Sequence, residues 1–478
     1  MTSAPPTRLV LRFADVGVAT YASLRVVGEP ARTVTWVVEE PFVVAAIEQV
    51  ADALPSPRDG ETMVDALRRS LLSGPFADPS TELRASYHLG LLLLSQQAWS
   101  LLLECVAAVR PVLHLTPTAR LAQIPFAMLA LPSVYPTADQ LVRAKAGAVL
   151  ATGEVLARLP WEAGDLTAYT EGYRLMELVD LVMSPPANIV HAPRRPARWE
   201  ERRTSPPVLI LDPRVPGQTP SSPLGSVLGR PSPDSMVAEH FAGALTSHAV
   251  YPPVSDTVEL FRRRDTDRNW LSVVLHDKPS RLLFVGHASA AASEVGYAER
   301  SALHLSCTAL HPGLADAVGS HRPWTAADLL ADTERWPMPP RVALVACASG
   351  TDHRFDEPNG LVAAMILAGS ELVTATLWSL PTTAGYRSLA EGDIAIDPMG
   401  ELITAVDSAH ESDDPVVVLG RWQRAQMRRW RSGDVTAHPV FWASLVTFSV
   451  PDREREIGAV PAQLRGTQTA TREESEER

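Results

Sequence analysis

The amino-acid sequence predicts an α/β fold with a mostly parallel β-sheet that is covered by helices on both faces. Apolar runs too short for helices recur along most of the chain, and stretches with helical spacing separate them. Strands that are apolar on both faces are what a helix-covered parallel sheet requires. The runs that predict strands are residues 111–116, 207–212, 281–286, 341–346, 371–378 and 443–449.

The first hundred residues follow a different pattern. Segments 8–14, 20–28 and 32–39 are rich in β-branched residues and are separated by turn residues, which predicts a β-meander. From Pro41 to about Arg110 the spacing of apolar residues becomes helical. Polar residues interrupt the apolar stretch 88–109, so two core helices fit it better than a membrane span does. Further helices are predicted at 235–245, 359–369 and 416–430.

These patterns divide the chain into three parts. Residues 1–104 form a β-meander and helical portion, residues 105–451 form the α/β domain, and residues 452–478 form a charged tail with few apolar anchors. We expect that tail to be disordered, and we expect the stretch 191–207, which is rich in Arg and Pro, to be unstructured. Its segment 194–203 is interpreted as a surface loop.

The composition and charge of the chain limit the classes of protein to which it can belong. The chain has 478 residues, of which 46% are hydrophobic and 21% charged, so it can bury a sizeable core. A formal net charge of -12 argues against nucleic acid and anionic membranes as partners. The three cysteines form no C-x-x-C pair, which predicts neither a disulfide framework nor a zinc site but a reduced, cytoplasmic protein. The first residues contain no secretion signal, and no metal or cofactor motif is present.

Two predicted strands end in chemically capable residues. The strand 281–286 runs into His287, and the strand 341–346 runs into Cys347. Functional groups collect beyond the carboxyl ends of parallel strands, so neighbouring strands would bring imidazole and thiol together. A cysteine nucleophile needs such a histidine to accept and return its proton. The alternative interpretation is a core cysteine and a structural histidine, and residue types alone do not decide between the two.

Small residues surround both positions. Gly286, Ala288, Ala346, Ala348 and Gly350 allow a substrate backbone to come close. The backbone amides of Ala288 and Cys347 are candidate donors to a developing oxyanion.

Several ordered motifs resemble those of the CHAT domain, a family of the caspase-like, separase-related cysteine peptidase clan. The resemblance extends from about Cys105 to Pro451. It includes a strand followed by histidine and a strand followed by Ala-Cys-x-Ser-Gly. The matching segments are "LTPTARLAQIPFAMLAL" (115–131), "FVGHAS" (284–289), "LVACASG" (344–350), "LVAAMILAGS" (361–370), "VTATLWSLP" (373–381) and "HPVFWASLVTFS" (438–449).

The resemblance implies a caspase-like fold and a cysteine endopeptidase, with His287 as general base and acid and Cys347 as nucleophile. Two departures stand out. Ala288 replaces the family's glycine after the histidine, which keeps the amide but adds a methyl group near the substrate path. The acidic residue that usually follows Leu-Trp is absent from "LWSLPTTAG", so cleavage after Arg or Lys is not expected on this basis.

Other residues are candidates for substrate contact or for packing. Asp352, Asp356 and Glu357 could supply an acidic subsite, although a solvated loop face is the favoured interpretation. Trp378 is a candidate to line the substrate cleft, with core filling as the alternative. His353 is interpreted as an exposed loop residue, and His304 as a strand residue. Cys105 and Cys307 sit in apolar contexts and are interpreted as packing residues.

The sequence therefore predicts a cysteine peptidase that cleaves protein or peptide substrates under the control of a regulatory protein partner. A role in bacterial stress, defence or cell death is suggested only by analogy with the family. The rival hypothesis is a catalytically inactive CHAT-like module that binds a protein partner. Other hydrolase and nucleotide-binding motifs are absent from the sequence.

Overall fold

The main feature of the computed structural model is a ten-stranded β-sheet. The structure describes residues 6–58, 60–106, 110–130, 174–219, 222–247, 249–289, 298–346, 360–389 and 396–450. The strands of this sheet are β1 (Arg8–Asp15), β2 (Ala19–Val26), β3 (Glu29–Glu39), β4 (Val112–Thr116), β5 (Asp180–Met183), β6 (Val208–Leu211), β7 (Arg281–Gly286), β11 (Arg341–Ala346), β12 (Leu372–Thr376) and β13 (Leu445–Ser449).

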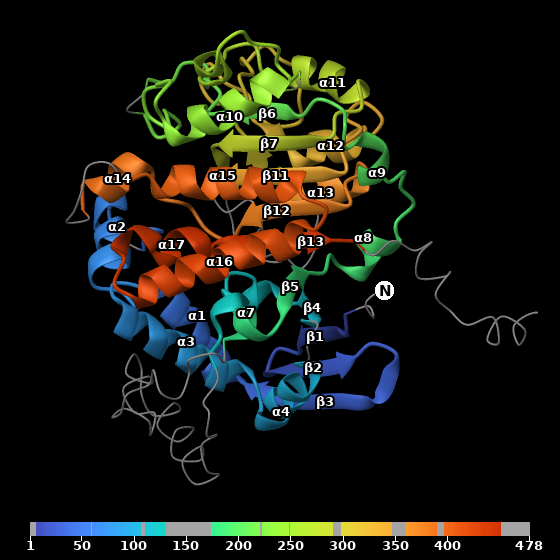
Figure 1. Ribbon diagram of the computed structural model, residues 1–478, viewed down its shortest axis with the longest axis vertical. Coiled ribbons are helices and arrows are strands. Elements are labelled where there is room, and N and C mark those ends of the chain that lie inside the picture. Colours follow the sequence, from blue (N-terminus) through green and yellow to red (C-terminus); the bar gives the residue numbers. More distant parts are fainter. Residues whose placement is uncertain are drawn as a thin grey trace, which may run out of the picture.

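The strand order confirms the predicted fold class. The order is β3-β2-β1-β4-β5-β13-β12-β11-β7-β6, and Figure 1 shows it from β6 at the top to β3 at the bottom. The meander β1–β3 is antiparallel and β13 runs antiparallel to β12, whereas the other neighbouring pairs are parallel. All the predicted strands are present, and β5 is an additional one that the sequence analysis missed.

Helices cover both faces of this sheet. Helix α15 contacts both α10 and α16, and these three helices cross in front of the strands in Figure 1, while α13 contacts both α8 and α12 in a second packed group. The helices are α1 (Glu40–Ala53), α2 (Met63–Leu72), α3 (Pro79–Leu93), α4 (Gln96–Cys105), α7 (Leu175–Leu178), α8 (Ala187–His191), α9 (Trp199–Arg202), α10 (Met236–Ser247), α11 (Arg268–His276), α12 (Ala326–Ala331), α13 (Leu361–Leu367), α14 (Thr383–Arg387), α15 (Pro398–Glu411), α16 (Pro415–Arg431) and α17 (Pro439–Trp442).

A small second sheet lies directly after β7. Its strands are β8 (Ala288–Ser289), β9 (Ala302–Leu303) and β10 (Trp324–Thr325), in the order β10-β9-β8. Both pairings are antiparallel. The chain therefore leaves the buried strand β7 through His287 and enters this sheet at once.

Residues 1–104 and 105–451 share one sheet, because β1 pairs in parallel with β4 across that predicted division. A buried ion pair adds a second connection. The guanidinium of Arg174 bonds both carboxylate oxygens of Glu82 in α3, and the two side chains have no exposed surface. Separating such a pair would leave an uncompensated buried charge, so the helices of the first part are firmly joined to the rest.

The segment 191–207, expected to be unstructured, is packed against the sheet domain, so that expectation is wrong. Trp199 is buried, and the guanidinium carbon of Arg341 lies 3.5 Å from the centre of its ring. The amide of Ala197 donates to the carbonyl of Gly369, 2.8 Å away. One buried tryptophan and a few backbone hydrogen bonds hold a segment whose Arg and Pro content alone suggested a loop. The predicted disordered tail, 452–478, lies outside the described residues.

A pair of matched glycine substitutions tests the close packing of α3. A Cβ atom at Gly90 would overlap the carbonyl oxygen of Ala130, whereas nothing lies within 4 Å of a Cβ at Gly243 in α10. We expect Gly90→Ala to lower the free energy of unfolding by about 3 kcal/mol through overpacking. Gly243→Ala should raise it by about 0.5–1 kcal/mol, because alanine favours a helix. Denaturant unfolding measures both, and equal effects of the two substitutions would contradict the packing described.

Candidate functional site

The register of β7 and β11 places the residues that precede the two predicted catalytic positions side by side at one edge of the sheet. The strands are parallel neighbours, and Gly286 pairs with Ala346 at their carboxyl ends. The next residues along the chain are His287 and Cys347. Cys347 lies outside the described residues, as do Ala348, Asp352, His353, Asp356 and Glu357. The structure thus describes the imidazole side of the predicted dyad, and the contact with the thiol stays a prediction.

His287 is held through one ring nitrogen. Its Nε2 lies 3.1 Å from the carbonyl oxygen of Gly225. A carbonyl only accepts, so Nε2 carries the hydrogen and, in the neutral ring, Nδ1 carries the lone pair. Burial of the half-buried ring lowers the pKa of His287 below its usual value near 6.5, and nearby Arg262 lowers it further. The hydrogen bond to Gly225 and the charge of Asp212 oppose this shift. The neutral ring, with Nδ1 as a base, is therefore favoured at neutral pH.

The loop that carries Gly225 is organised by Asp212, which the sequence analysis did not single out. Asp212 follows β6 and is 1% exposed. Its carboxylate accepts from the amides of Val227 and Leu228 at 3.1 and 3.3 Å and from the hydroxyl of Ser226 at 2.5 Å. Since β6 neighbours β7 in parallel, Asp212 emerges at the same edge as His287. The sequence does contain a signal for this role, because Asp212 directly follows the apolar run that forms β6, as His287 follows β7.

Arg262 connects Asp212 with the carbonyl that holds the histidine. One guanidinium nitrogen of Arg262 lies 3.1 Å from the carboxylate of Asp212 and 3.1 Å from the carbonyl oxygen of Gly225. The Gly225 carbonyl thus accepts from both His287 and Arg262. The bond from Arg262 therefore holds the Gly225 carbonyl in the position where it accepts from His287. The orientation of the His287 ring thus depends on the loop after β6 and on the loop that carries Arg262.

The backbone amide of Ala288 points away from β9. The amide of His304 donates to the carbonyl of His287 at 3.0 Å, which makes these two residues a hydrogen-bonded pair. The next pair is Ala288 with Leu303. Because hydrogen-bonded and non-hydrogen-bonded pairs alternate in an antiparallel ladder, Ala288 directs its N–H outward. The N–H of Ala288 is therefore not used in the ladder with β9, and its role as an oxyanion donor stays a prediction.

Trp378 does not line a cleft, in contrast to the candidate role considered for it. Its side chain has no exposed surface, and its indole nitrogen donates to the carbonyl of Val440 at 2.9 Å. The residue fills core space next to the end of β12, which was the alternative interpretation. Its position in the motif is therefore explained by packing and by a satisfied indole donor.

Cys105 and Cys307 are both buried, as predicted for packing residues. Burial raises the pKa of each thiol above its usual value. Cys307 Sγ accepts the backbone N–H of Arg268 at 3.3 Å. Neither residue has the low thiol pKa and exposure that a nucleophilic thiolate requires.

A groove lies at the carboxyl edge of the sheet beside the loop that holds His287. One wall is the segment Ser226–Ser232, and the other includes Thr382, Thr383 and Arg387. These threonines stand where the family's acidic residue is usually found. The structure brings Asp397 to this place, since its carboxylate accepts from the hydroxyl of Thr383 at 2.6 Å and it also lines the groove. The sequence does not indicate this proximity, because Asp397 reaches the segment after Leu-Trp only in the folded chain.

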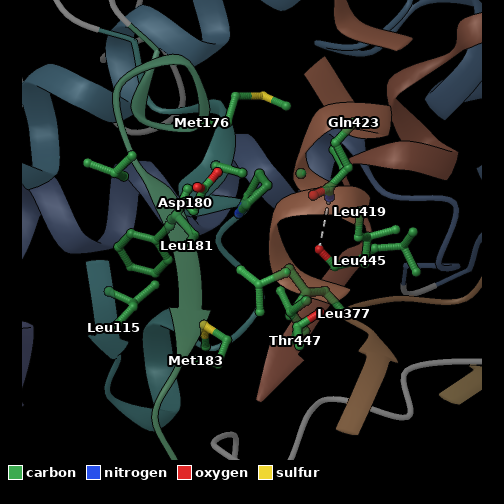
Figure 2. A pocket seen from close by; sticks show the side chains of 18 of the residues that line it. Leu115, Met176, Asp180, Leu181, Met183, Leu377, Leu419, Gln423, Leu445 and Thr447 are labelled. Carbon is green, nitrogen blue, oxygen red and sulfur yellow. Dashed lines mark hydrogen bonds between the residues drawn. The ribbon is translucent and has the colours of Figure 1, made fainter. Parts of the chain in front are cut away.

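A second hollow lies between α16 and the strands β4, β5 and β13 (Figure 2). Its walls are mainly apolar, and Figure 2 shows Leu181, Leu419 and Leu445 around it. The carboxylate of Asp180 at its margin is paired with Arg424 at 3.1 Å. Of the predicted site residues that the structure describes, none lines it.

The pKa of His287 can be measured without any substrate. We expect a ring titration by nuclear magnetic resonance to give a midpoint below 6.5, because burial disfavours the charged ring. The unfolded chain then binds more protons than the folded chain below that pH, so acidification through this range lowers the free energy of unfolding.

Substitution of Arg262 tests the electrostatic part of this account. Arg262→Gln removes a cation that lowers the pKa of His287, so the midpoint should rise. Arg263→Gln is the matched control, because Arg263 pairs with Asp265 instead and is not among the groups that shift the pKa of His287. An unchanged midpoint in Arg262→Gln would contradict the described contact.

The profile of the CHAT domain matches residues 92–392, which is more than half of the chain. No curated protein matches the sequence. In the part of the chain that the structure describes, no helix is long and apolar enough to cross a membrane. The same residues contain no group of three or more His, Cys, Asp or Glu side chains placed to bind a metal ion.

Proposed function

The chain belongs to the CHAT domain family, and we propose that it is a cysteine endopeptidase in which His287 and Cys347 form the catalytic dyad. The observation that carries the proposal is the pairing of Gly286 with Ala346 at the ends of β7 and β11. Strands about 4.8 Å apart bring the residues that follow them within side-chain reach of each other. The neutral His287 ring, with its Nε2–H given to Gly225, supports the role of Nδ1 as the base.

The proposed reaction has two steps. Nδ1 of His287 takes the proton of the Cys347 thiol, and the sulfur attacks the carbonyl carbon of the scissile peptide bond. The carbonyl electron pair moves onto oxygen, where the amides of Ala288 and Cys347 donate hydrogen bonds. His287 then returns the proton to the leaving amine, and the C–N bond breaks. Water, deprotonated by His287, hydrolyses the acyl-enzyme and regenerates the thiol.

We further propose that the substrates are proteins or peptides in the cytoplasm and that a regulatory protein partner controls cleavage. The acidic groups near the groove are candidates for substrate contact. Asp397 joins Asp352 and Asp356 in this role because it borders the groove. A bacterial stress, defence or death pathway is a proposal from family analogy only.

Labelling with a panel of peptidyl aldehyde and ketone probes tests the dyad. We expect the chain to react, and Cys347→Ala to abolish the reaction. His287→Ala should slow it by about 10³-fold or more, because the thiol loses its base. Cys105→Ala and His311→Gln serve as matched controls, since Cys105 is a buried packing residue and His311 bonds only Thr308 and Asp267 in a separate loop.

The rival function is an inactive module that binds a partner protein. It would be favoured if the folded chain failed to react with every probe, both alone and with cell extract added as a source of partners. Equal reactivity of Cys347→Ala and the unsubstituted chain would also contradict the peptidase proposal. Circular dichroism of each variant separates loss of reaction from loss of fold.

A further inference from the structure

Two buried histidines connect the strand after His287 to the base of a neighbouring loop. His304 Nε2 lies 3.1 Å from Ser289 Oγ, and His304 Nδ1 lies 3.0 Å from His321 Nε2. His321 Nδ1 lies 2.8 Å from the carbonyl oxygen of Cys307. These contacts form a continuous chain of hydrogen bonds, here called the histidine relay, which consists of Ser289, His304, His321 and the Cys307 carbonyl.

Only one arrangement of hydrogens satisfies the histidine relay when both rings are neutral. The Cys307 carbonyl can only accept, so His321 Nδ1 carries a hydrogen and His321 Nε2 a lone pair. That lone pair must accept from His304 Nδ1–H, which leaves the lone pair of His304 on Nε2. The Ser289 hydroxyl must therefore donate to His304.

Burial keeps the two rings neutral. His304 is 6% exposed and His321 is 1% exposed. Burial lowers the pKa of His304 to about 3, and electrostatic interaction with His321 and His287 lowers it as well. The pKa of His321 is also lowered, chiefly by burial and in part by Arg268, although its bond to Cys307 opposes the shift. The direction of the hydrogen bonds is therefore fixed across the neutral pH range.

We propose that the histidine relay positions the Ala288–Ser289 strand, so that the amide of Ala288 stays aligned with the oxyanion. This inference rests on the proposed peptidase function. Ser289, His304 and His321 are positioning residues, because they act through the backbone of Ala288 and not on the reacting atoms.

The placement of the relay supports this role. Ala288 is held on β9 only by a two-residue strand, which is a short ladder. The bond from His304 N–H to the His287 carbonyl fixes the backbone before Ala288, and the Ser289 side chain fixes it afterward. The Ala288 amide is thus held on both sides by contacts to one residue, His304.

The far end of the relay is also anchored. The Cys307 carbonyl accepts a second bond from the amide of Arg322 at 3.3 Å, and Cys307 Sγ accepts from the amide of Arg268 at 3.3 Å. The guanidinium of Arg268, itself 1% exposed, bonds the carbonyls of Pro312 and Pro323 and pairs with Asp328. The relay therefore connects the Ala288 strand to a rigid support.

The tautomers of the two rings test the geometry without any enzymatic assay. Ring ¹⁵N spectra at pH 7 should show His304 and His321 as neutral Nδ1–H tautomers and His287 as the Nε2–H tautomer. His304 should remain neutral down to pH 5. A signal for the Nε2–H tautomer of His304 or His321, or titration of His304 near pH 6.5, would overturn the relay.

The functional role is tested at Ser289, which is exposed and can be changed without opening the core. A peptidyl aldehyde forms an oxyanion when the thiolate adds to its carbonyl carbon, whereas alkylation by iodoacetamide displaces iodide and forms none. We expect Ser289→Ala to slow the aldehyde reaction about 10-fold, a fraction of what loss of a whole oxyanion donor costs. Alkylation should change less than about twofold, since no oxyanion is stabilised in that reaction.

Controls separate the relay from general damage to the fold. Ser289→Thr keeps the hydroxyl and should react with the aldehyde at close to the original rate. His321→Gln should behave like Ser289→Ala, and His311→Gln, in the same loop but outside the relay, should not. Equal slowing of both reagents by Ser289→Ala, or no slowing of the aldehyde, would overturn the positioning role.

Failure of the proposed function has a different signature. If the unsubstituted chain shows no Cys347-dependent reaction with the aldehyde, the peptidase proposal is wrong, and the positioning role is overturned with it. The ring tautomers would still report whether the hydrogen-bond chain exists. If the unsubstituted chain reacts with the aldehyde and Ser289→Ala reacts at the same rate, only the positioning role of the relay is overturned and the peptidase proposal stands.

Discussion

Burial of four neighbouring parallel strands on both faces is the constraint on which the rest of the structure depends. Every residue of β6, β7, β11 and β12 is buried. Polar side chains cannot be placed along such strands without compensation, so chemistry is confined to their ends. The shared direction of the strands then brings the residues that follow them to one edge, and that edge contains His287, Asp212 and the groove.

The two ends of these strands serve different purposes. At the amino ends, Arg281 and Arg341 are buried, and helix α15 supplies their partners. Arg281 pairs with Asp407 at 3.0 Å, and Arg341 donates to the carbonyl of His410 at 2.7 Å. The first contact is a buried ion pair and the second is a hydrogen bond to a neutral carbonyl, so structural partners hold both guanidinium groups. At the carboxyl ends, the polar groups instead orient one another around His287, which is the arrangement a reactive site needs.

Local pattern predicted most strands and helices because each of them carries its own apolar signal. The four-residue strand β5 was missed since so short a run has no distinctive period. The helix predicted at 359–369 is α13, which spans Leu361–Leu367 with Gly360 as its N-cap. The segment 191–207 was misjudged because one tryptophan and contacts with distant residues, not composition, decide its order. For Trp378, the Leu-Trp motif marked the position but did not indicate whether the side chain packs in the core or contacts a substrate.

The sequence by itself determined the fold class, the strands that carry the candidate residues and the family, because apolar periodicity and ordered motifs are local properties. The tertiary structure alone decided which groups surround His287. Asp212 and Gly225 come from the loop after β6, Arg262 comes from the loop before α11, and the relay joins Ser289 after β7 to His304 and His321. A hydrogen bond depends on distance and direction between residues remote in the chain, and no pattern of neighbouring residues records these.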